Sequence, residues 1–132
     1  MRKTALIPAS VTRGEPQQRC LARDVFDRIG DKWSVEVIYN LTEGTRRFTE
    51  LRREIDGISQ RMLTVTLRAL ERDGIVRRTV FPVVPPRVEY ELTPLGETLR
   101  SLIGALVDWS TEHTADVDAA RLDYDRRVPE TL

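Results

Sequence analysis

Three arginines share one side of a segment whose end signals predict a complete helix over residues 60–73. Ser59 is a favourable N-cap, and Gly74 stands where a left-handed C-cap belongs. At about 100° per residue, leucines gather on one side of this helix for packing. The opposite side carries Arg61, Thr64, Val65, Arg68 and Arg72. Guanidinium groups suit phosphate oxygens and guanine edges, so the pattern predicts a polyanion-binding surface, with an ordinary solvated helix face as the alternative.

The charges of the chain are unevenly distributed, although the net charge is +0. Residues 46–78 contain nine arginines and five acids, whereas residues 93–132 contain four arginines and eight acids. A basic middle and an acidic end indicate that the middle meets a polyanion, while the end has another task.

The length and composition limit the classes of protein that the chain can belong to. Its 132 residues suffice for one domain, and shares of 40% hydrophobic and 32% charged residues are typical of a globular protein. No apolar run approaches the roughly 20 residues of a membrane span, and no signal peptide is evident, so we expect a cytoplasmic protein. One cysteine excludes an internal disulfide framework. One histidine, no phosphate-binding glycine loop and no metal-ligand spacing argue against an enzyme, a cofactor or a metal site.

The chain before the arginine-bearing helix predicts three helices after a mobile arm over residues 1–18. Apolar residues recur at helical spacing over residues 20–29, and Asp31 then caps a second helix. Residues 46–48 predict a very short strand that leads to Thr49, the expected N-cap of a third helix of about two turns. A short helix, a tight glycine turn and the arginine-bearing helix make a helix-turn-helix, whose second helix enters the major groove of DNA.

Two strands are predicted after the arginine-bearing helix, over residues 76–81 and 87–92, because polar and apolar residues alternate there. The connection over residues 82–86 is too rich in proline to pair as a strand. This hairpin is a wing, and three helices followed by a wing define a winged-helix domain.

The end of the chain predicts a dimerisation element. Thr93 caps a last helix that runs to about residue 113, and its apolar face is broader than a winged-helix domain needs, so a second copy of the chain is the expected partner. Residues 114–132 form an acidic extension that either lengthens this helix or folds back over the dimer. The predicted fold class is therefore mainly α (α+β): a winged helix-turn-helix over residues 19–113 with a two-stranded wing and a long C-terminal dimerisation helix.

Six short motifs occur in order along the chain. They are I-G-D-K-W at 29–33, R-R-F-T-E-L at 46–51, G-I-S at 57–59, L-x-x-D-G-I-V at 70–76, P-P-R-V-E-Y at 85–90 and L-T-P-L-G at 92–96. Through them the chain resembles the HxlR-type branch of the MarR-like winged-helix transcription regulators. The resemblance implies a homodimeric bacterial regulator, a repressor or an activator, that binds double-stranded DNA. A two-fold dimer should require an inverted repeat with half-sites about one helical turn apart.

The resemblance also implies that the first and last helices of the domain form the dimer. The interface residues expected on this basis are Leu21, Val25, Leu99, Leu102, Ile103, Leu106 and Trp109. Trp109 could instead line a ligand pocket between the subunits.

Cys20 is the residue through which an effector could act. Several regulators of this type respond to aldehydes, quinones or oxidants through a cysteine just before the first helix, where Cys20 stands. Their usual Cys-Pro is Cys20-Leu21 here, which alters the helix start. A helix N-terminus with Arg19 and Arg23 nearby would favour the reactive thiolate, whereas a small buried hydrophobe is the alternative.

The residues of the predicted DNA interface divide by role. Gln60, Arg61 and Thr64 are expected to reach base edges. Phosphate contacts are expected from Ser59, Arg68, Arg72, Arg46, Arg47, Arg52 and Arg53. Arg87, expected at the base of the wing, could enter the minor groove or pair with Glu89 or Glu91. The alternative function is a winged-helix protein-interaction module without sequence-specific DNA binding.

Overall fold

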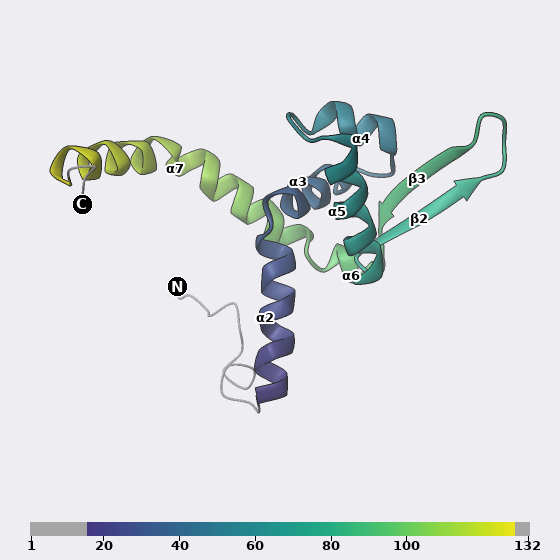
Figure 1. The fold of residues 1–132 in the computed structure, drawn as a ribbon, viewed down its shortest axis with the longest axis horizontal. Helices are drawn as coiled ribbons and strands as arrows, with labels where there is room; N and C mark the ends of the chain where they lie inside the picture. The colour runs from purple at the N-terminus through teal and green to yellow at the C-terminus, as the bar shows by residue number, and fades with distance from the viewer. Residues whose placement is uncertain (1–15, 129–132) are drawn as a thin grey trace.

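The computed structural model describes residues 16–128, and the side chains of residues 23–128. Its elements are α2 (Pro16–Gly30), α3 (Lys32–Leu41), β1 (Arg46–Arg47), α4 (Phe48–Glu54), α5 (Gln60–Arg72), β2 (Val76–Phe81), β3 (Arg87–Leu92), α6 (Pro94–Glu97) and α7 (Arg100–Arg127). Helices α3, α4 and α5 form a central body, from which the hairpin, α2 and α7 extend in different directions (Figure 1). The predicted mainly α winged-helix architecture is confirmed.

The very short strand predicted over residues 46–48 is confirmed as β1, and it joins the two strands of the wing in one sheet. The strand order is β1-β3-β2, and both pairings are antiparallel. Strand β1 pairs with β3 through Arg46 opposite Tyr90 and Arg47 opposite Glu89. Because α4 follows β1 directly, this short pairing holds the start of the helix-turn-helix against the wing.

Helix α3 carries the centre of the core. The Asp31 carboxylate accepts a hydrogen bond from the Ser34 N–H at 3.0 Å, which confirms the predicted N-cap. Val37 and Ile38, one helical turn further on, have no exposed surface.

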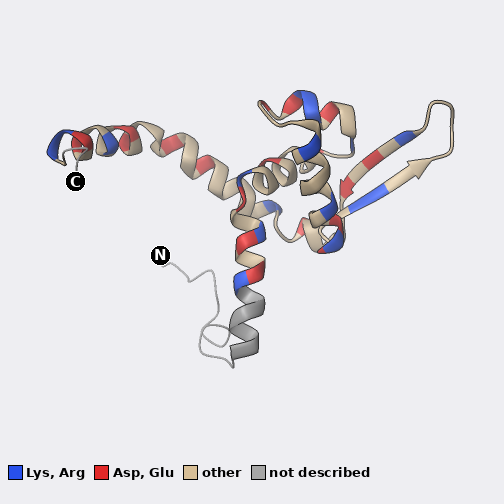
Figure 2. Ribbon diagram, in the orientation of Figure 1, with Lys and Arg blue, Asp and Glu red and all other residues tan. Residues whose placement is uncertain are grey.

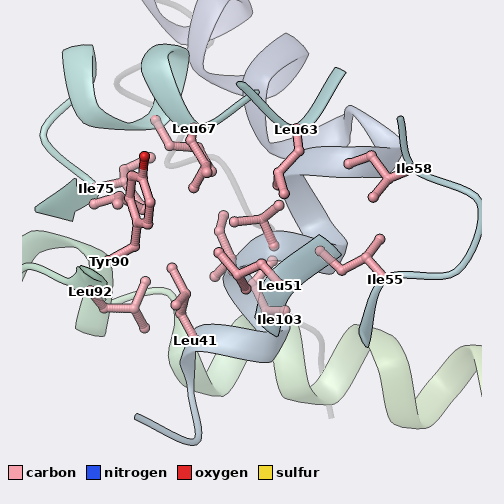
Figure 3. Close-up of a cluster of buried hydrophobic side chains, with 14 residues drawn as sticks. Leu41, Leu51, Ile55, Ile58, Leu63, Leu67, Ile75, Tyr90, Leu92 and Ile103 are labelled. Atoms are coloured by element: carbon pink, nitrogen blue, oxygen red, sulfur yellow. The ribbon is translucent and has the colours of Figure 1, made fainter. Parts of the chain in front are cut away.

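Apolar side chains from every element of the body converge on α3 (Figure 3). Leu51 comes from α4, Leu63 and Leu67 come from α5, and Leu92 comes from β3. Helix α7 contributes Ile103, whose side chain is fully buried. Each such burial stabilises the fold by about 1.5–3 kcal/mol, so these contacts fix how the helices lie against one another.

Two helices begin earlier than predicted. Helix α4 has Arg47 as its N-cap, and not Thr49, because the Glu50 carboxylate accepts a hydrogen bond from the Arg47 N–H at 2.7 Å. Helix α2 begins at Pro16, so residues 16–18 are helical and the expected start at Cys20 is wrong. Proline at the first helical position suits a helix start, since its missing N–H would have no partner there. The rest of the predicted mobile arm lies outside the described residues.

The predicted last helix is divided in two. The N–H groups of Thr98 and Leu99 donate to carbonyls only three residues back, at 3.1 Å and 3.0 Å, and this tighter turn separates α6 from α7. Helix α7 then continues to Arg127, so residues 114–127 lengthen the helix and do not fold back. Val107, one turn after Ile103, still packs against the core, and beyond it α7 stands away from the body (Figure 1).

A close backbone approach joins α6 to the end of α5. The Thr93 N–H donates to the Ile75 carbonyl at 3.0 Å, and the Thr93 hydroxyl donates to the Gly74 carbonyl. The same hydroxyl oxygen accepts from the Gly96 N–H at 3.0 Å and so caps α6. A Cβ on Gly96 would lie 2.2 Å from the Ile75 carbonyl oxygen, which explains why glycine stands here.

We expect Gly96→Ala to lower the free energy of unfolding by about 2–3 kcal/mol, because the added methyl group forces backbone apart. Urea unfolding followed by far-UV circular dichroism measures this loss. Gly30→Ala is the matched control, since its Cβ would meet nothing within 4 Å, and its effect should stay within about 0.5 kcal/mol. Equal midpoints for the two variants would show that the approach at Gly96 is not close.

Candidate nucleic-acid interface

Helix α5 has both ends fixed as the sequence predicts. The Ser59 hydroxyl oxygen accepts a hydrogen bond from the Met62 N–H at 3.0 Å. At the other end Gly74 has a φ of +79°, and the Ile75 N–H donates to the Leu70 carbonyl at 3.0 Å. The expected packing side of the helix, Leu63, Thr66, Leu67 and Leu70, is buried. The orientation of α5 in the body is therefore determined.

The opposite side of α5 faces solvent and is basic. Arg61, Arg68 and Arg72 are exposed on it, and no ion pair holds them within the part of the chain that the structure describes. We call the exposed side formed by Arg61, Val65, Arg68 and Arg72 the arginine face. Figure 2 shows basic residues, with acidic ones among them, on α4, α5 and the hairpin, and acidic residues recurring along α7. Three free guanidinium groups along one helix suit a row of phosphates and base edges.

Two of the three predicted base-contacting residues have internal hydrogen bonds. The Thr64 hydroxyl donates to the Gln60 carbonyl at 2.9 Å, so only its oxygen lone pairs are free. The Gln60 side-chain oxygen accepts from Arg52 at 3.5 Å, a long bond that ties α5 to α4. No hydrogen bond or ion pair within the described residues uses the guanidinium donors of Arg61. It is therefore the strongest of the three candidates for a base contact.

The arginines at β1 and α4 differ in availability. Arg46 pairs with Glu43 at 3.0 Å and with Glu54 at 3.3 Å, and only 22% of its side chain is exposed. Arg46 therefore links the turn before β1 to α4, and a phosphate would have to displace two carboxylates to reach it. Arg47 and Arg53 are exposed and remain available.

Arg87 lies at the tip end of the wing, and not at its base as expected. It pairs with Phe81 across the last rung of the hairpin, next to the connecting loop (Figure 1). Its guanidinium lies 4.4 Å from the centre of the Phe81 ring and 3.1 Å from the Glu89 carboxylate. Of the two expected roles, the ion pair with Glu89 is the one that the structure contains. The loop beyond it is uncharged, and Val84 there is 99% exposed.

Sequence reasoning did not select Arg78, which is a further exposed cation on the wing. It lies on β2 opposite Tyr90, and Tyr90 in turn lies opposite Arg46 on β1. Arg78 is exposed and has no ion pair among the described residues, whereas its neighbour Arg77 pairs with Glu91 at 3.4 Å. The position of Arg78 opposite Tyr90 depends on the register of the strands, which no local signal in the sequence fixes.

The residues predicted for the dimer interface separate into available and buried ones. Val25, Leu102, Leu106 and Trp109 are exposed. Leu99 is partly buried against the core, and the Leu21 side chain lies outside the described residues. Ile103 is a correction: it is fully buried in this chain's own core and is not available to a partner.

Helix α2 contacts the end of α5 through one ion pair. The Arg28 guanidinium lies 2.7 Å from the carboxylate of Asp73, the C-cap of α5. A groove of about 750 Å³ runs beside this pair, and its apolar lining includes Val25, Ile29 and Leu95. The helix expected to dimerise is thus connected directly to the helix expected to bind DNA.

The described residues offer little that suits catalysis. Within residues 16–128 no three His, Cys, Asp or Glu side chains gather as a metal site, and no helix there is long and apolar enough to cross a membrane. The His113 ring stacks on Trp109 with centroids 4.7 Å apart, and the pKa of Glu97 is lowered by its hydrogen bond from Arg100. Both are side-chain contacts on the surfaces of helices.

Comparison with known proteins agrees with this geometry. The family model for the HxlR-like helix-turn-helix matches residues 28–118. The HTH-type transcriptional regulator YtfH of Escherichia coli is 45% identical over 104 residues, which are 79% of this chain and 82% of YtfH. The structure of transcriptional regulator YtfH from Salmonella typhimurium has a TM-score of 0.72 at 44% identity, over 76% of this chain and 89% of that one. The redox regulator HypR in its reduced form has a TM-score of 0.70 at 40% identity, over 75% and 98%.

The fold and the exposed α5 define a winged helix-turn-helix protein with a long C-terminal helix. The extent of the family match then identifies the chain further: it belongs to the HxlR-like helix-turn-helix family of transcription regulators.

Proposed function

We propose that this protein is a homodimeric, sequence-specific DNA-binding transcription regulator that acts on an inverted-repeat operator. The observation that carries the proposal is the arginine face of α5, which is free of ion pairs among the described residues and lies on the second helix of a helix-turn-helix. Because this ligand is chromosomal DNA, we place the protein in the cytoplasm.

Residues at different positions along α5 contact different parts of the DNA. Arg61, in the first turn, contacts a guanine through its paired donors, with Gln60 and Thr64 beside it. Arg68 and Arg72, further along, contact phosphates, as do Arg47 and Arg53 on the neighbouring elements. The Ser59 hydroxyl keeps its proton for a phosphate oxygen while its lone pair caps the helix.

The proposed dimer forms through α2 and α7. The exposed apolar residues Leu102, Leu106 and Trp109 lie on α7, and Val25 lies on α2. A two-fold axis between them would place two α5 helices about one turn of DNA apart, near 10 base pairs.

The DNA proposal predicts different effects for three arginines. The full-length protein first selects its operator from a random duplex pool, and anisotropy then measures affinity across a salt series. Arg61→Ala should reduce the preference for the operator over scrambled duplex. Arg68→Ala should weaken binding to all duplexes and lower the salt slope by about one for each phosphate that the variant no longer binds. Arg46→Ala is the control, because Arg46 is already held by Glu43 and Glu54, and the slope should stay unchanged.

Failure of the selection to enrich any sequence would contradict the regulator proposal and favour the alternative, a winged helix that binds a protein partner. Equal effects of Arg61→Ala and Arg68→Ala would contradict only the division between base and phosphate contacts.

Leu106→Asp is predicted to weaken the dimer at least tenfold, since it places a charge in an apolar interface. Sedimentation equilibrium should give a dimer for the wild type and a concentration-dependent mixture for the variant. Ala115→Asp adds the same charge on the opposite side of α7, where it should have no effect. A wild-type monomer, or equal effects of both variants, would rule out this interface.

Cys20 supports a second proposal, redox or electrophile sensing, because the similar structures include the redox regulator HypR in reduced and oxidised forms. Cys20 lies in the second turn of α2, so a helix N-terminus would stabilise its thiolate less than expected. The proposal therefore rests on the relatives.

Diamide should join two Cys20 thiols in an intersubunit disulfide, taking up the two protons and two electrons that they lose. Non-reducing electrophoresis should show a band of twice the mass, absent in Cys20→Ser. A treated wild type that stays monomeric on the gel and keeps its operator affinity would refute the sensor.

A further inference from the structure

Val65 is an apolar side chain in the middle of the arginine face. Arg61 precedes it by one helical turn and Arg68 follows it by one turn on the same side. Its surface is 51% exposed, and it is not part of the core cluster. The valine thus lies where α5 would meet the floor of the major groove.

Nothing in the fold favours valine at this position. A β-branched residue on the exposed side of a helix forms helix less readily than alanine, arginine or glutamine. The core beneath is filled by Leu63, Leu67 and Leu70 from the other side of α5. Neither helix formation nor packing in the core requires this side chain, which leaves it available for contact with a ligand.

The hydrogen-bonding residues around Val65 are partly used within the chain. The Thr64 hydroxyl donates to the Gln60 carbonyl, and the Gln60 side-chain oxygen accepts from Arg52. Between Arg61 and Arg68, Val65 therefore presents a bare apolar surface among groups that bind anions. In the major groove the matching feature is the methyl group of thymine, which the other three bases lack.

We propose that Val65 is a specificity-determining residue that selects thymine at one position of each half-site, by packing its methyl groups against the thymine methyl. This inference rests on the proposed DNA-binding function and assigns part of its sequence preference. Arg61 and Val65 on successive turns then read a guanine and a nearby thymine through different chemistry.

The test removes the thymine methyl group without changing base pairing. The selected operator is synthesised with deoxyuridine in place of thymidine, one symmetric pair of positions at a time. Binding of the full-length protein is measured at low salt, where phosphate contacts keep weakened variants on the DNA. At one pair of positions, deoxyuridine should lower the affinity of the wild-type protein roughly fourfold per half-site, or roughly fifteenfold for both half-sites. This is the loss expected for one buried methyl group in each half-site.

Val65→Ala should bind the thymidine and deoxyuridine operators equally, because the side chain that senses the methyl group is gone. Met62→Ala is the matched control: Met62 is 39% exposed on the same helix but lies at the border of the packing side, and the deoxyuridine effect should persist in it. Alanine forms helix well, so neither variant should lose α5.

The outcomes of this test distinguish failure of the thymine contact from failure of the proposed DNA-binding function. An operator that is selected normally, with no deoxyuridine effect or with the same effect in Val65→Ala, would overturn the thymine contact and leave DNA binding intact. Loss of the deoxyuridine effect in Met62→Ala instead would assign the methyl contact to Met62 and also overturn it. Failure to select any operator would overturn both.

Discussion

The burial of one side of α5 against α3 is the contact on which the rest of the structure depends. Leu63, Leu67 and Leu70 each have at most 1% of their surface exposed. Because the sides of a helix have a fixed angular relation, burying the leucines turns the arginine face outward. Three buried leucines contribute about 1.5–3 kcal/mol each, whereas exposed like charges repel by only about 1 kcal/mol at 4 Å in water. Packing therefore outweighs the repulsion among the arginines and can hold them together without neutralising acids.

Local signals were enough to predict α5 and the hairpin, since caps, glycine positions and side-chain alternation act within a few residues. They failed where a contact spans the chain. The pairing of β1 with β3 joins residues more than 40 positions apart, and it places Arg46 beside Tyr90. Arg46 looked like a phosphate ligand because it stands in a basic run, but the turn before β1 brings Glu43 to it, and Glu54 reaches it once α4 has folded back. Ile103 read as an interface residue because α7 is apolar on several sides, and only tertiary packing shows that its side chain belongs to the core.

The junction of α2 with the body connects α2, which is expected at the dimer interface, directly to the end of α5. Arg28 on α2 pairs with Asp73 at the end of α5, and the groove beside them is open. Asp73 also begins the turn that leads through Gly74 to Ile75, whose carbonyl receives the Thr93 N–H at the start of α6. A displacement of α2 would thus move the C-terminal end of α5 and the start of α6, which leads into α7, together. The two elements expected at the dimer interface and the end of α5 form one connected unit.

The even balance of charge does not weaken the case for a polyanionic ligand, because distance separates the two signs. Helix α7 has 28 residues and spans roughly 42 Å at about 1.5 Å per residue. At physiological ionic strength charges are screened beyond about 8 Å, so acids along the outer part of α7 have little effect on a phosphate at α5. The local excess of arginine over residues 46–78 then sets the potential at the arginine face, while the acidic end reduces attraction elsewhere on the molecule. Such a distribution orients the protein toward DNA by one side, which a uniformly basic chain of the same size would not do.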